Sequence, residues 1–315
     1  MLVDMHFHST QSDGGLNSNE LVEKIKSKGG KIAVCTDHDI VNKEIVNLLA
    51  NENITSCEGV EISVGTFIDG TERHLHMTAY SKSFSPELIQ ILNGIVENRK
   101  VKIIGQIGQL EKSGFEINKD SFFEYLAQRG TNLNNINNFH IAQYIFENPS
   151  NLNLVKKLLG ENVDMGLFIR QCLKKKGDFK HIGCYEIEKY EPEIIDIIKN
   201  LDNGVLSIAH PNFSFELPKI QDPIERQKQE FAAFEKFVKQ AVQQGVKAIE
   251  IGTLCDKNWT EKIIRLANKH NLIITFGSDF HYNIFDERHV DMFEKNPHAS
   301  DYLIEKNIDR LFSQL

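Results

Sequence analysis

Two histidines near the beginning of the chain, His6 and His8, are separated by one residue, and Asp13 follows five residues later. Imidazole nitrogens and carboxylate oxygens are groups with which proteins bind transition-metal ions. Side chains two positions apart on a strand project from the same face, so His6 and His8 could bind one ion together. For an isolated pair of this kind, an ordinary surface or hydrogen-bonded role is favoured by roughly two to one.

Further fragments with compatible ligands shift this balance. They are Thr36-Asp37-His38-Asp39, Gly59-Val60-Glu61, His74-Leu75-His76, Ala209-His210-Pro211 and Gly277-Ser278-Asp279-Phe280-His281. Nearly every fragment ends a run rich in β-forming residues, and active sites of parallel β/α barrels are built at the carboxyl ends of their strands. Imidazoles and carboxylates that converge in this way predict a multi-metal hydrolase.

The runs that must position these residues alternate between strands and helices. Strands are predicted at Leu2–Phe7, Lys31–Thr36, Ile54–Ser63, His74–Tyr80, Val205–Ala209, Ala248–Ile251 and Leu272–Phe276. Helical spacing of apolar residues covers Asn19–Ser27, Asn42–Asn51, Pro223–Gln244 and Trp259–His270. This alternation implies an α/β fold with parallel strands and right-handed crossovers.

Residues 85–199 form a different region, which is expected to be mostly helical. Helices are predicted at Ile91–Ser113, Ser121–Gln128, Asn138–Glu147 and Ile194–Leu201, and an asparagine-rich polar loop at Thr131–Asn138. We therefore expect one domain made of residues 1–84 and 200–315, interrupted by a helical insertion at 85–199. The insertion is expected to cover the metal site and to select the substrate.

The formal net charge of −8 indicates an acidic surface. A protein that coats duplex DNA needs many Lys and Arg side chains to neutralise phosphates, so stable duplex binding is not expected. A phosphorylated substrate is still compatible with this charge. Part of the acidic excess lies in the candidate ligands, and bound cations would reverse its local sign.

The cellular location is predicted from the cysteines and from the apolar segments. The five cysteines are scattered and form no Cys-x-x-Cys pair, which favours reduced thiols in a cytoplasmic protein. No positively charged, apolar segment precedes the first predicted strand, so export by a signal peptide is not expected. No apolar stretch approaches the ~20 residues needed to cross a bilayer, so no membrane partner is expected.

Taken together, the motifs have a recognisable order. They read HxH…SDG (His6, His8, Ser12-Asp13-Gly14), TDHD (Thr36–Asp39), GVEIS (Gly59–Ser63), AHP (Ala209–Pro211) and SDFH (Ser278–His281). This combination resembles the polymerase-and-histidinol-phosphatase (PHP) family, and within it the branch of stand-alone metal-dependent phosphoesterases. The motifs cover residues 1–80 and 204–285. The resemblance implies a distorted seven-stranded (β/α)7 TIM-like barrel with a mostly helical insertion.

The resemblance also implies how two or three divalent ions would be held. One ion is expected on His6, His8, Glu61 and Asp279, a second on Glu61, His76 and His210, and a third on Asp13, His38 and His281. A bridging Glu61 is physically sensible, because two cations about 3.5–4 Å apart need an anion between them. Ligand atoms that are only nitrogen and oxygen favour Mn, Fe or Zn over Mg.

His74 competes with His76 for one ligand place, because both side chains project from the same face of the strand. The spacing around His76 fits the family pattern better, so His74 is expected at the rim, in contact with substrate. Asp4, Asp37 and Asp39 are expected to accept the far N–H groups of the ligating imidazoles, which would set their tautomers. For Asp39, an ordinary cap or turn role fits equally well.

These features predict an enzyme that hydrolyses a phosphate ester by the attack of a metal-bound hydroxide on phosphorus. Glu61 and Asp13 are expected to be catalytic through the ions, and either His140 or His74 would act as the general acid. No order of Ser, His and Asp suggests an acyl-transfer triad. No G-x-x-x-x-G-K-[ST] loop for nucleoside triphosphates is present in the sequence.

The substrate is less well determined. Relatives in the same branch act on nucleoside monophosphates, on nucleotide bisphosphates, or as exonucleases at the 5′ end of short RNA or DNA. In them, an Arg-Pro-His-Ile-Ala segment of the insertion helps to hold phosphate, and the matching residues here are Asn138-Phe139-His140-Ile141-Ala142. His140 is kept as a candidate substrate contact, but the amide of Asn138 cannot replace a bidentate guanidinium. Arg99 could supply the missing cation, although a solvent-facing arginine is the slightly favoured alternative.

Three classes of function therefore remain. The first is a phosphatase for a nucleotide, histidinol phosphate or another small molecule, and the second is an exonuclease on short single strands. A non-catalytic, metal-stabilised binding module ranks last, because every ligand place is filled. The basic stretch of Arg170, Lys174, Lys175, Lys176 and Lys180 could attract an oligonucleotide, although a solvated helix end is favoured by roughly two to one.

Overall fold

The computed structural model describes residues 1–68, 71–188, 190–217, 220–282 and 290–315. Its strands form two sheets. The parallel pair consists of β1 (Val3–Phe7) and β2 (Ile32–Cys35). The larger sheet has the order β3-β4-β5-β6-β7 and consists of β3 (Glu58–Ile68), β4 (Thr71–Ser81), β5 (Val205–Ile208), β6 (Ala248–Gly252) and β7 (Ile273–Gly277).

The predicted α/β fold is confirmed, but the described residues do not show one continuous closed barrel. The two sheets meet at two seams, where single bridges replace a ladder. On one side Phe7 pairs with Phe280, and on the other Ile32 pairs with Thr55 and His38 with Glu61.

The expectation that all the strands run parallel is wrong for β4. Strands β3 and β4 pair antiparallel over their whole length, from Ile68–Thr71 to Glu58–Ser81, and β4 also pairs antiparallel with β5. Consecutive strands with only a few residues between them can form a hairpin, whereas a parallel crossover needs a dozen residues or more. The pairs β5–β6 and β6–β7 are parallel, as predicted.

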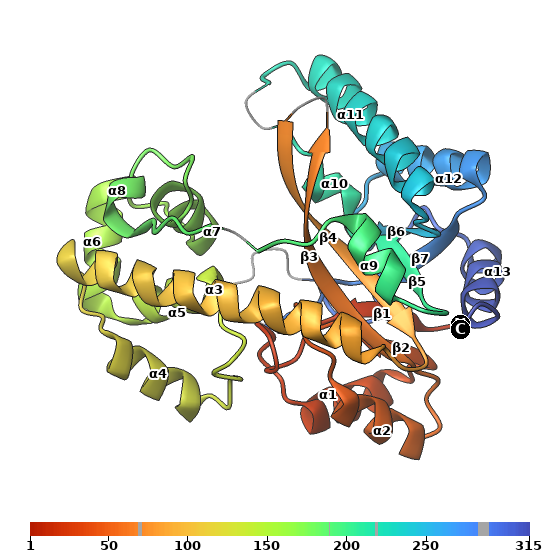
Figure 1. Cartoon of the computed structure of the whole chain (residues 1–315), viewed down its shortest axis with the longest axis horizontal. Coiled ribbons are helices and arrows are strands. Elements are labelled where there is room, and N and C mark those ends of the chain that lie inside the picture. The colour runs from red at the N-terminus through yellow and green to blue at the C-terminus, as the bar shows by residue number, and fades with distance from the viewer. Residues whose placement is uncertain (69–70, 189, 218–219, 283–289) are drawn as a thin grey trace.

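Helices cover the outside of the strands (Figure 1). They are α1 (Ser18–Lys28), α2 (Lys43–Asn51), α11 (Pro223–Gln244), α12 (Lys257–His270) and α13 (Asp301–Phe312). The short helix α10 (Pro211–Ser214) directly follows His210. Every residue of β2, β5, β6 and β7 is buried, as expected for strands covered on both faces. None of the described helices combines the length and the apolar character that a bilayer crossing needs.

The middle of the chain is helical, as predicted. It contains α3 (Pro86–Lys112), α4 (Lys119–Gln128), α5 (Asn138–Glu147), α6 (Pro149–Leu159), α7 (Met165–Phe168), the π-helical turn η1 (Ile169–Leu173), α8 (Lys180–Gly183) and α9 (Ile194–Asn200). Helix α3 begins after Ser85, whose side chain accepts the N–H of Leu88, and Pro86 occupies its first turn.

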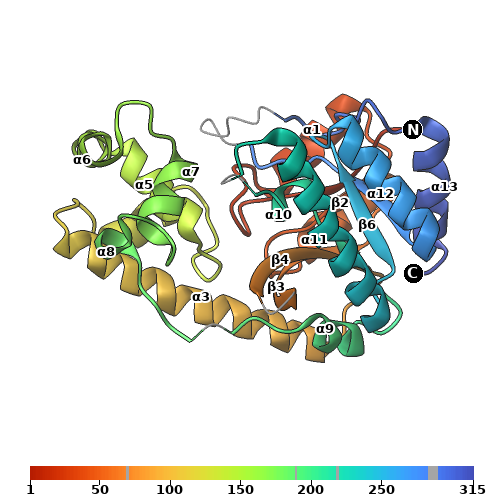
Figure 2. The same cartoon turned by 90° about the horizontal axis from the view of Figure 1, so that it is seen from above.

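Helix α3 runs from the strands to the other helices of the insertion, as Figure 2 shows, and its side chains belong to two hydrophobic cores. In its first half Leu88 and Leu92 pack with the strands, while in its second half Ile107 and Leu110 pack with α4 to α8. Ile194 and Ile197 of α9 also belong to the core of the strands. The predicted boundaries between the barrel domain and the insertion, at residues 84/85 and 199/200, remain predictions. Both ends of the predicted insertion pack against the core of the strands.

Candidate metal centre

The predicted ligands come together where the two sheets meet. At one seam the backbone N–H of His8 donates to Phe280 at 2.9 Å, and that of Asp279 donates to His6 at 2.7 Å. At the other seam the N–H of Glu61 donates to Asp37 at 3.2 Å, and the N–H of Asp39 donates back to Glu61 at 2.8 Å. The backbone pairing that joins the sheets therefore also aligns the candidate ligands.

Glu61 lies at the centre of this cluster and is fully buried. Its Oε2 atom lies 3.3 Å from Nε2 of His6, 3.3 Å from Nε2 of His8 and 3.1 Å from Nδ1 of His38. Its Oε1 atom lies 3.0 Å from Nδ1 of His76 and 2.7 Å from Nε2 of His210. One carboxylate thus faces five imidazoles that arrive from four separate segments of the chain.

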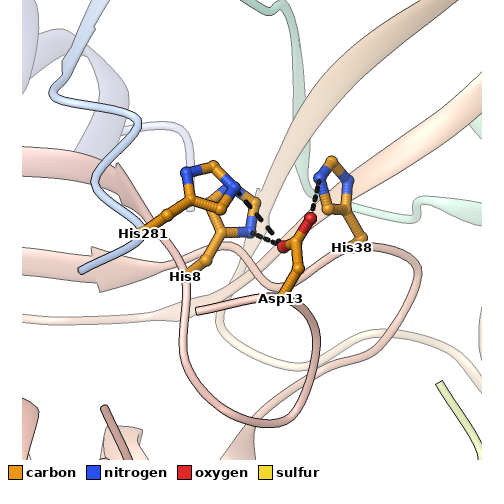
Figure 3. Close-up of side chains that lie close together, drawn as sticks. All are labelled: His8, Asp13, His38 and His281. Atoms are coloured by element: carbon orange, nitrogen blue, oxygen red, sulfur yellow. Dashed lines mark ion pairs between the residues drawn. The ribbon is translucent and has the colours of Figure 1, made fainter. Parts of the chain in front are cut away.

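A second carboxylate, Asp13, organises the other side of the cluster (Figure 3). Its Oδ1 atom lies 3.3 Å from Nε2 of His281 and 3.8 Å from Nδ1 of His8. Its Oδ2 atom lies 3.6 Å from Nε2 of His38. His8 and His38 therefore face both carboxylates, which makes the two halves one continuous centre.

Among the residues that the structure describes, three groups of side chains are close enough to hold an ion. Their ligand atoms lie within 4.8 Å of one another, and the groups are His6-His8-Glu61-Asp279, His8-Asp13-His38-His281 and His38-Glu61-His76. The first has the membership predicted from the motifs, and the second adds His8 to the predicted set. The third contains His38 where His210 was predicted, although His210 contacts the same oxygen of Glu61 as His76 does. The assignment of ligands to individual ions remains a prediction.

The chemistry of these atoms fits divalent cations. His6 Nε2, His8 Nε2, Asp13 Oδ1 and Glu61 Oε2 are buried and have no hydrogen-bond partner among the described residues. A buried polar atom without a partner costs about 1–3 kcal/mol, and such atoms are rare in native proteins. All four point into the shared centre, where an ion would supply the missing partner. The nitrogen and oxygen donors suit Mn, Fe or Zn.

The electrostatics of the centre point the same way. Burial alone would raise the pKa of Glu61, but the imidazoles of His38, His76 and His6 outweigh it and hold the pKa of that carboxyl well below its usual range. Burial alone would lower the pKa of His8, but its contacts with Asp279 and Glu61 raise it to about 10. Carboxylates this deeply buried need positive charge beside them, which protons or metal ions can supply.

Among the carboxylates expected behind the ligands, Asp4 and Asp37 have a different role from the predicted one, whereas Asp39 has the alternative role in a turn. Asp4 accepts the N–H and the hydroxyl of Ser278 at 3.0 and 2.6 Å, and Asp37 accepts those of Ser9 at 2.7 and 2.6 Å. Asp39 accepts the N–H of Ser63 at 2.7 Å. These hydrogen bonds hold the backbone of the segments that carry the candidate ligands.

The carboxylate that orients an imidazole is Glu250, which was not predicted from the sequence. Its Oε2 atom lies 2.7 Å from Nδ1 of His6, and its Oε1 atom accepts the N–H of His210 at 3.2 Å. The residue is fully buried in β6, between apolar neighbours. A charged residue within an otherwise apolar strand was the available signal, since buried carboxylates are rare unless paired.

Backbone strain and a close approach of two strands both occur at this centre. Asp39, His210 and Asp279 have positive φ angles of 55°, 25° and 56°. Such conformations are uncommon for residues other than glycine, and they cluster at functional sites. A Cβ atom on Gly277 would lie 2.2 Å from Cβ of His6, so only glycine lets β7 approach β1 this closely.

A cavity of about 340 Å³ lies between the metal centre and the helical insertion. Its lining includes His38 and His76 from the centre, together with Asn138, Phe139, Lys174 and Tyr190 from the insertion. Among the residues predicted to contact substrate, His74 and Arg99 line this cavity. Lys175, from the same basic stretch as Lys174, pairs with Glu186 at 2.9 Å.

The contacts of His74 and Arg99 set their orientation. His74 forms an ion pair with Glu191 through Nδ1. Arg99 donates from Nη1 to Asp39 and from Nη2 to Asn135, both at 2.6 Å, and its side chain is only 18% exposed. Arg99 is therefore not a solvent-facing arginine.

His140 lies away from the cavity lining. Its side chain is buried, and its Nδ1 accepts the backbone N–H of Asn137 at 3.0 Å, at the start of α5. Burial lowers the pKa of this imidazole to about 4. The contact favours a role in holding the first turn of α5, and the predicted role as general acid gains no support from it.

Comparisons with known proteins agree with this picture. No protein-family model matches the sequence. The chain is 24% identical over 129 residues to the phosphoribosyl 1,2-cyclic phosphate 1,2-diphosphodiesterase of Eggerthella lenta, covering 39% of this chain and 48% of that protein. It is 34% identical over 64 residues to the 3′,5′-nucleoside bisphosphate phosphatase of Chromobacterium violaceum, covering 20% and 22%. It is 29% identical over 142 residues to the 5′-3′ exoribonuclease of Haemophilus influenzae, covering 40% and 51%.

Solved structures show the same fold over nearly the whole chain. A protein described as an amidohydrolase from Chromobacterium violaceum, with bound sulfate and no metal, superposes with a TM-score of 0.72 at 20% identity and covers 100% of this chain and 97% of that one. A candidate metal-dependent phosphoesterase from Bifidobacterium adolescentis gives 0.67 at 18% identity, covering 98% and 96%. The matches to the curated relatives span about half of their length or less. The resemblance to the PHP family that the motifs predicted is confirmed.

Proposed function

We propose that this chain, a relative of the PHP-family proteins, is a metal-dependent phosphoesterase. Its substrate is the phosphate ester of a nucleotide or the 5′ end of a short oligonucleotide. The observation that carries the proposal is the position of Glu61, a buried carboxylate surrounded by imidazoles beside a cavity with cationic side chains. The names of the curated relatives support the reaction class, since each refers to a phosphatase, a phosphodiesterase or an exoribonuclease.

The ions would be held by the ligands predicted from the motifs. His6, His8, Glu61 and Asp279 would hold one ion; Glu61, His76 and His210 a second, with His38 near; and Asp13, His38 and His281 a third, with His8 near. When bound, Mn, Fe or Zn ions supply Lewis-acid chemistry, which lowers the pKa of water and neutralises phosphoryl oxygens. Glu61 and Asp13 are thus catalytic residues in this proposal.

The cavity would hold the rest of the substrate. Lys102 and Lys174 place ammonium groups on its wall, where they would attract phosphate oxygens. Arg99 adds a guanidinium whose orientation is set by Asp39. Phe139 and Tyr190 offer ring surface against which a base could pack.

His74 is the better candidate for the proton donor to the leaving oxygen. It lines the cavity, whereas His140 is buried behind Asn137. Its contact with Glu191 through Nδ1 would orient the ring.

The finer features predicted from the sequence belong to the same proposal. The bridges at both seams support a distorted seven-stranded barrel as the arrangement of the two sheets. A cytoplasmic location and the absence of stable duplex DNA binding remain predictions. A phosphatase for histidinol phosphate or another small molecule is the second candidate, because a cavity of about 340 Å³ accepts a small phosphate monoester as well. A non-catalytic binding module is the least supported, since all the ligand positions are filled.

A direct assay tests the proposal. The purified protein is loaded with Mn²⁺ and incubated with nucleoside monophosphates, nucleoside bisphosphates, histidinol phosphate and a 5′-phosphorylated oligonucleotide. Phosphate release and oligonucleotide shortening distinguish the candidate substrates. Turnover by the wild type with loss in Glu61→Gln is expected. Equal turnover in a purified, metal-analysed Glu61→Gln variant would refute the proposal.

A further inference from the structure

The asparagine-rich loop of the insertion does more than border the cavity. Asn132 donates its backbone N–H to Thr10 at 2.9 Å and its side-chain amide to Gln11 at 3.0 Å. Asn137 donates its side-chain amide to Oδ2 of Asp13 at 2.8 Å. Thus hydrogen bonds connect this loop, residues 132–137, to the segment that carries the candidate ligand Asp13.

Asn135 is the most buried part of this contact, with 2% of its surface exposed. Its Nδ2 group donates to the carbonyl of Gln11 at 3.0 Å and to the carbonyl of His38 at 2.6 Å. Its Oδ1 atom accepts from Nη2 of Arg99 at 2.6 Å. Both donor hydrogens and the acceptor of one amide are thus used, and they connect the Asp13 segment, the His38 segment and helix α3.

The turn that carries His38 is held from a second direction. The next residue, Asp39, has a φ angle of 55°, a left-handed conformation that surrounding contacts must maintain. Its carboxylate accepts from Arg99 at 2.6 Å and from the N–H of Ser63 at 2.7 Å. Arg99 therefore contacts both Asp39 and Asn135, so that helix α3 and the asparagine-rich loop support the same turn.

We propose that Asn135 is a positioning residue that couples the helical insertion to the metal groups containing His38 and Asp13. This inference rests on the metal centre of the proposed function. Two of the three groups contain His38, namely His8-Asp13-His38-His281 and His38-Glu61-His76. The group His6-His8-Glu61-Asp279 contains neither His38 nor Asp13, so its ion would bind without help from the insertion.

The substitution Asn135→Asp tests this coupling with almost no change of shape. An aspartate can still accept from Arg99, but it loses both donated hydrogen bonds and places negative charge against two carbonyl oxygens. The matched control is Asn134→Asp, the same change one residue away. The side chain of Asn134 is exposed, and its Oδ1 atom accepts from Lys100 at 3.1 Å. Mn²⁺ binding is followed by calorimetric titration and by elemental analysis after gel filtration.

We expect Asn135→Asp to keep one tightly bound ion and to bind the others about 10–100-fold more weakly, as replacement of a residue behind metal ligands does. Asn134→Asp should bind like the wild type. Unchanged stoichiometry and affinity in Asn135→Asp would overturn the inference, as would an equal loss at every ion. A wild-type protein that binds no Mn²⁺, Fe²⁺ or Zn²⁺ would instead reject the proposed function.

A second variant decides the question if Asn135→Asp does not fold. Asn137→Ser keeps a good N-cap residue for α5 but cannot reach Asp13. We expect the same selective weakening of binding in this variant. Wild-type affinity for every ion in folded Asn137→Ser would overturn the coupling between the insertion and the metal centre.

Discussion

Nδ1 of His6 lies 2.7 Å from Oε2 of Glu250, and both side chains are fully buried although the residues are 244 positions apart in the chain. The carboxylate accepts the proton of Nδ1, and Nε2 faces Glu61 and Asp279 at 3.3 and 3.6 Å, where it would bind a cation once it has lost its own proton. A carboxylate behind a ligating imidazole sets its tautomer and direction. Glu250 therefore prepares His6 for a cation.

Replacement of Glu250 by alanine should weaken binding of the ion held by His6 about 10–100-fold, because the imidazole loses its orienting partner. Glu250→Gln keeps an acceptor and should show a smaller loss. The measurement is a calorimetric Mn²⁺ titration. The control is Glu230→Ala. Glu230 lies on α11, and its buried carboxylate accepts the N–H of Leu217 at 2.9 Å. The control substitution should lower the stability of the fold without changing the affinity for Mn²⁺. Equal Mn²⁺ affinities in Glu250→Ala, Glu250→Gln and Glu230→Ala would contradict the role of Glu250.

Uptake of metal should release protons. Contacts with carboxylates raise the pKa of His8 to about 10, so this imidazole is protonated at pH 7 in the metal-free protein and must lose its proton to bind an ion. Affinity should therefore rise with pH, by about tenfold per pH unit for each proton released, up to about pH 10. Titrations in buffers with different ionisation enthalpies measure this release. Binding heats that do not depend on the buffer would contradict it.

His140 should make the protein sensitive to acid. Its pKa is lowered by burial from 6.5 to about 4, so the unfolded state binds a proton more readily than the folded state between these values. The sign follows from linkage: stability is complete above pH 6.5 and falls as the pH drops towards 4, by at most about 3 kcal/mol.

Urea unfolding of metal-free His140→Gln across this pH range checks the prediction. The variant should lose part of the acid sensitivity of the wild type. His181→Gln, at an exposed histidine, should keep all of it. A parallel pH dependence in wild type and His140→Gln would show that other groups cause the acid sensitivity.

Gly277 and Gly108 should respond in opposite directions to alanine. A Cβ at Gly277 would collide with His6 at 2.2 Å, so Gly277→Ala should destabilise the fold by about 1–3 kcal/mol or more and displace His6. A Cβ at Gly108, within α3, meets nothing within 4 Å, so Gly108→Ala should stabilise by about 0.5–1 kcal/mol. Thermal unfolding measures both effects. A neutral Gly277→Ala variant would show that the contact between β7 and β1 relaxes easily.

Local sequence patterns were sufficient for the elements that local interactions stabilise. Helices α5 and α11 have the predicted bounds, Asn138–Glu147 and Pro223–Gln244. Each begins after a residue whose side chain accepts backbone N–H groups, Asn137 and Asp222, and this capping can be read from the sequence. Helix α13, which was not predicted, also has such a cap at Ser300.

Strand direction was not read correctly from the local sequence pattern. Strand β4 was predicted to begin at His74, and the longer run that pairs with β3 from Thr71 onwards was missed. Asp69-Gly70, between the two strands in the sequence, is a dipeptide typical of hairpins and was the available signal. The residues of β3 and β4 also fit two consecutive parallel strands, because the alternation of side chains along a strand does not encode the direction of the strand.

The sequence by itself determined which residues could bind metal, because ligand chemistry belongs to the side chain and the spacing of His6 and His8 sets their common face. Only the tertiary structure decided which carboxylates support these ligands and how the insertion contacts them. Glu250 meets His6, and Asn135 meets His38, across separations of 244 and 97 residues. No local periodicity records such pairs, because they arise when separate strands and helices pack around a common core.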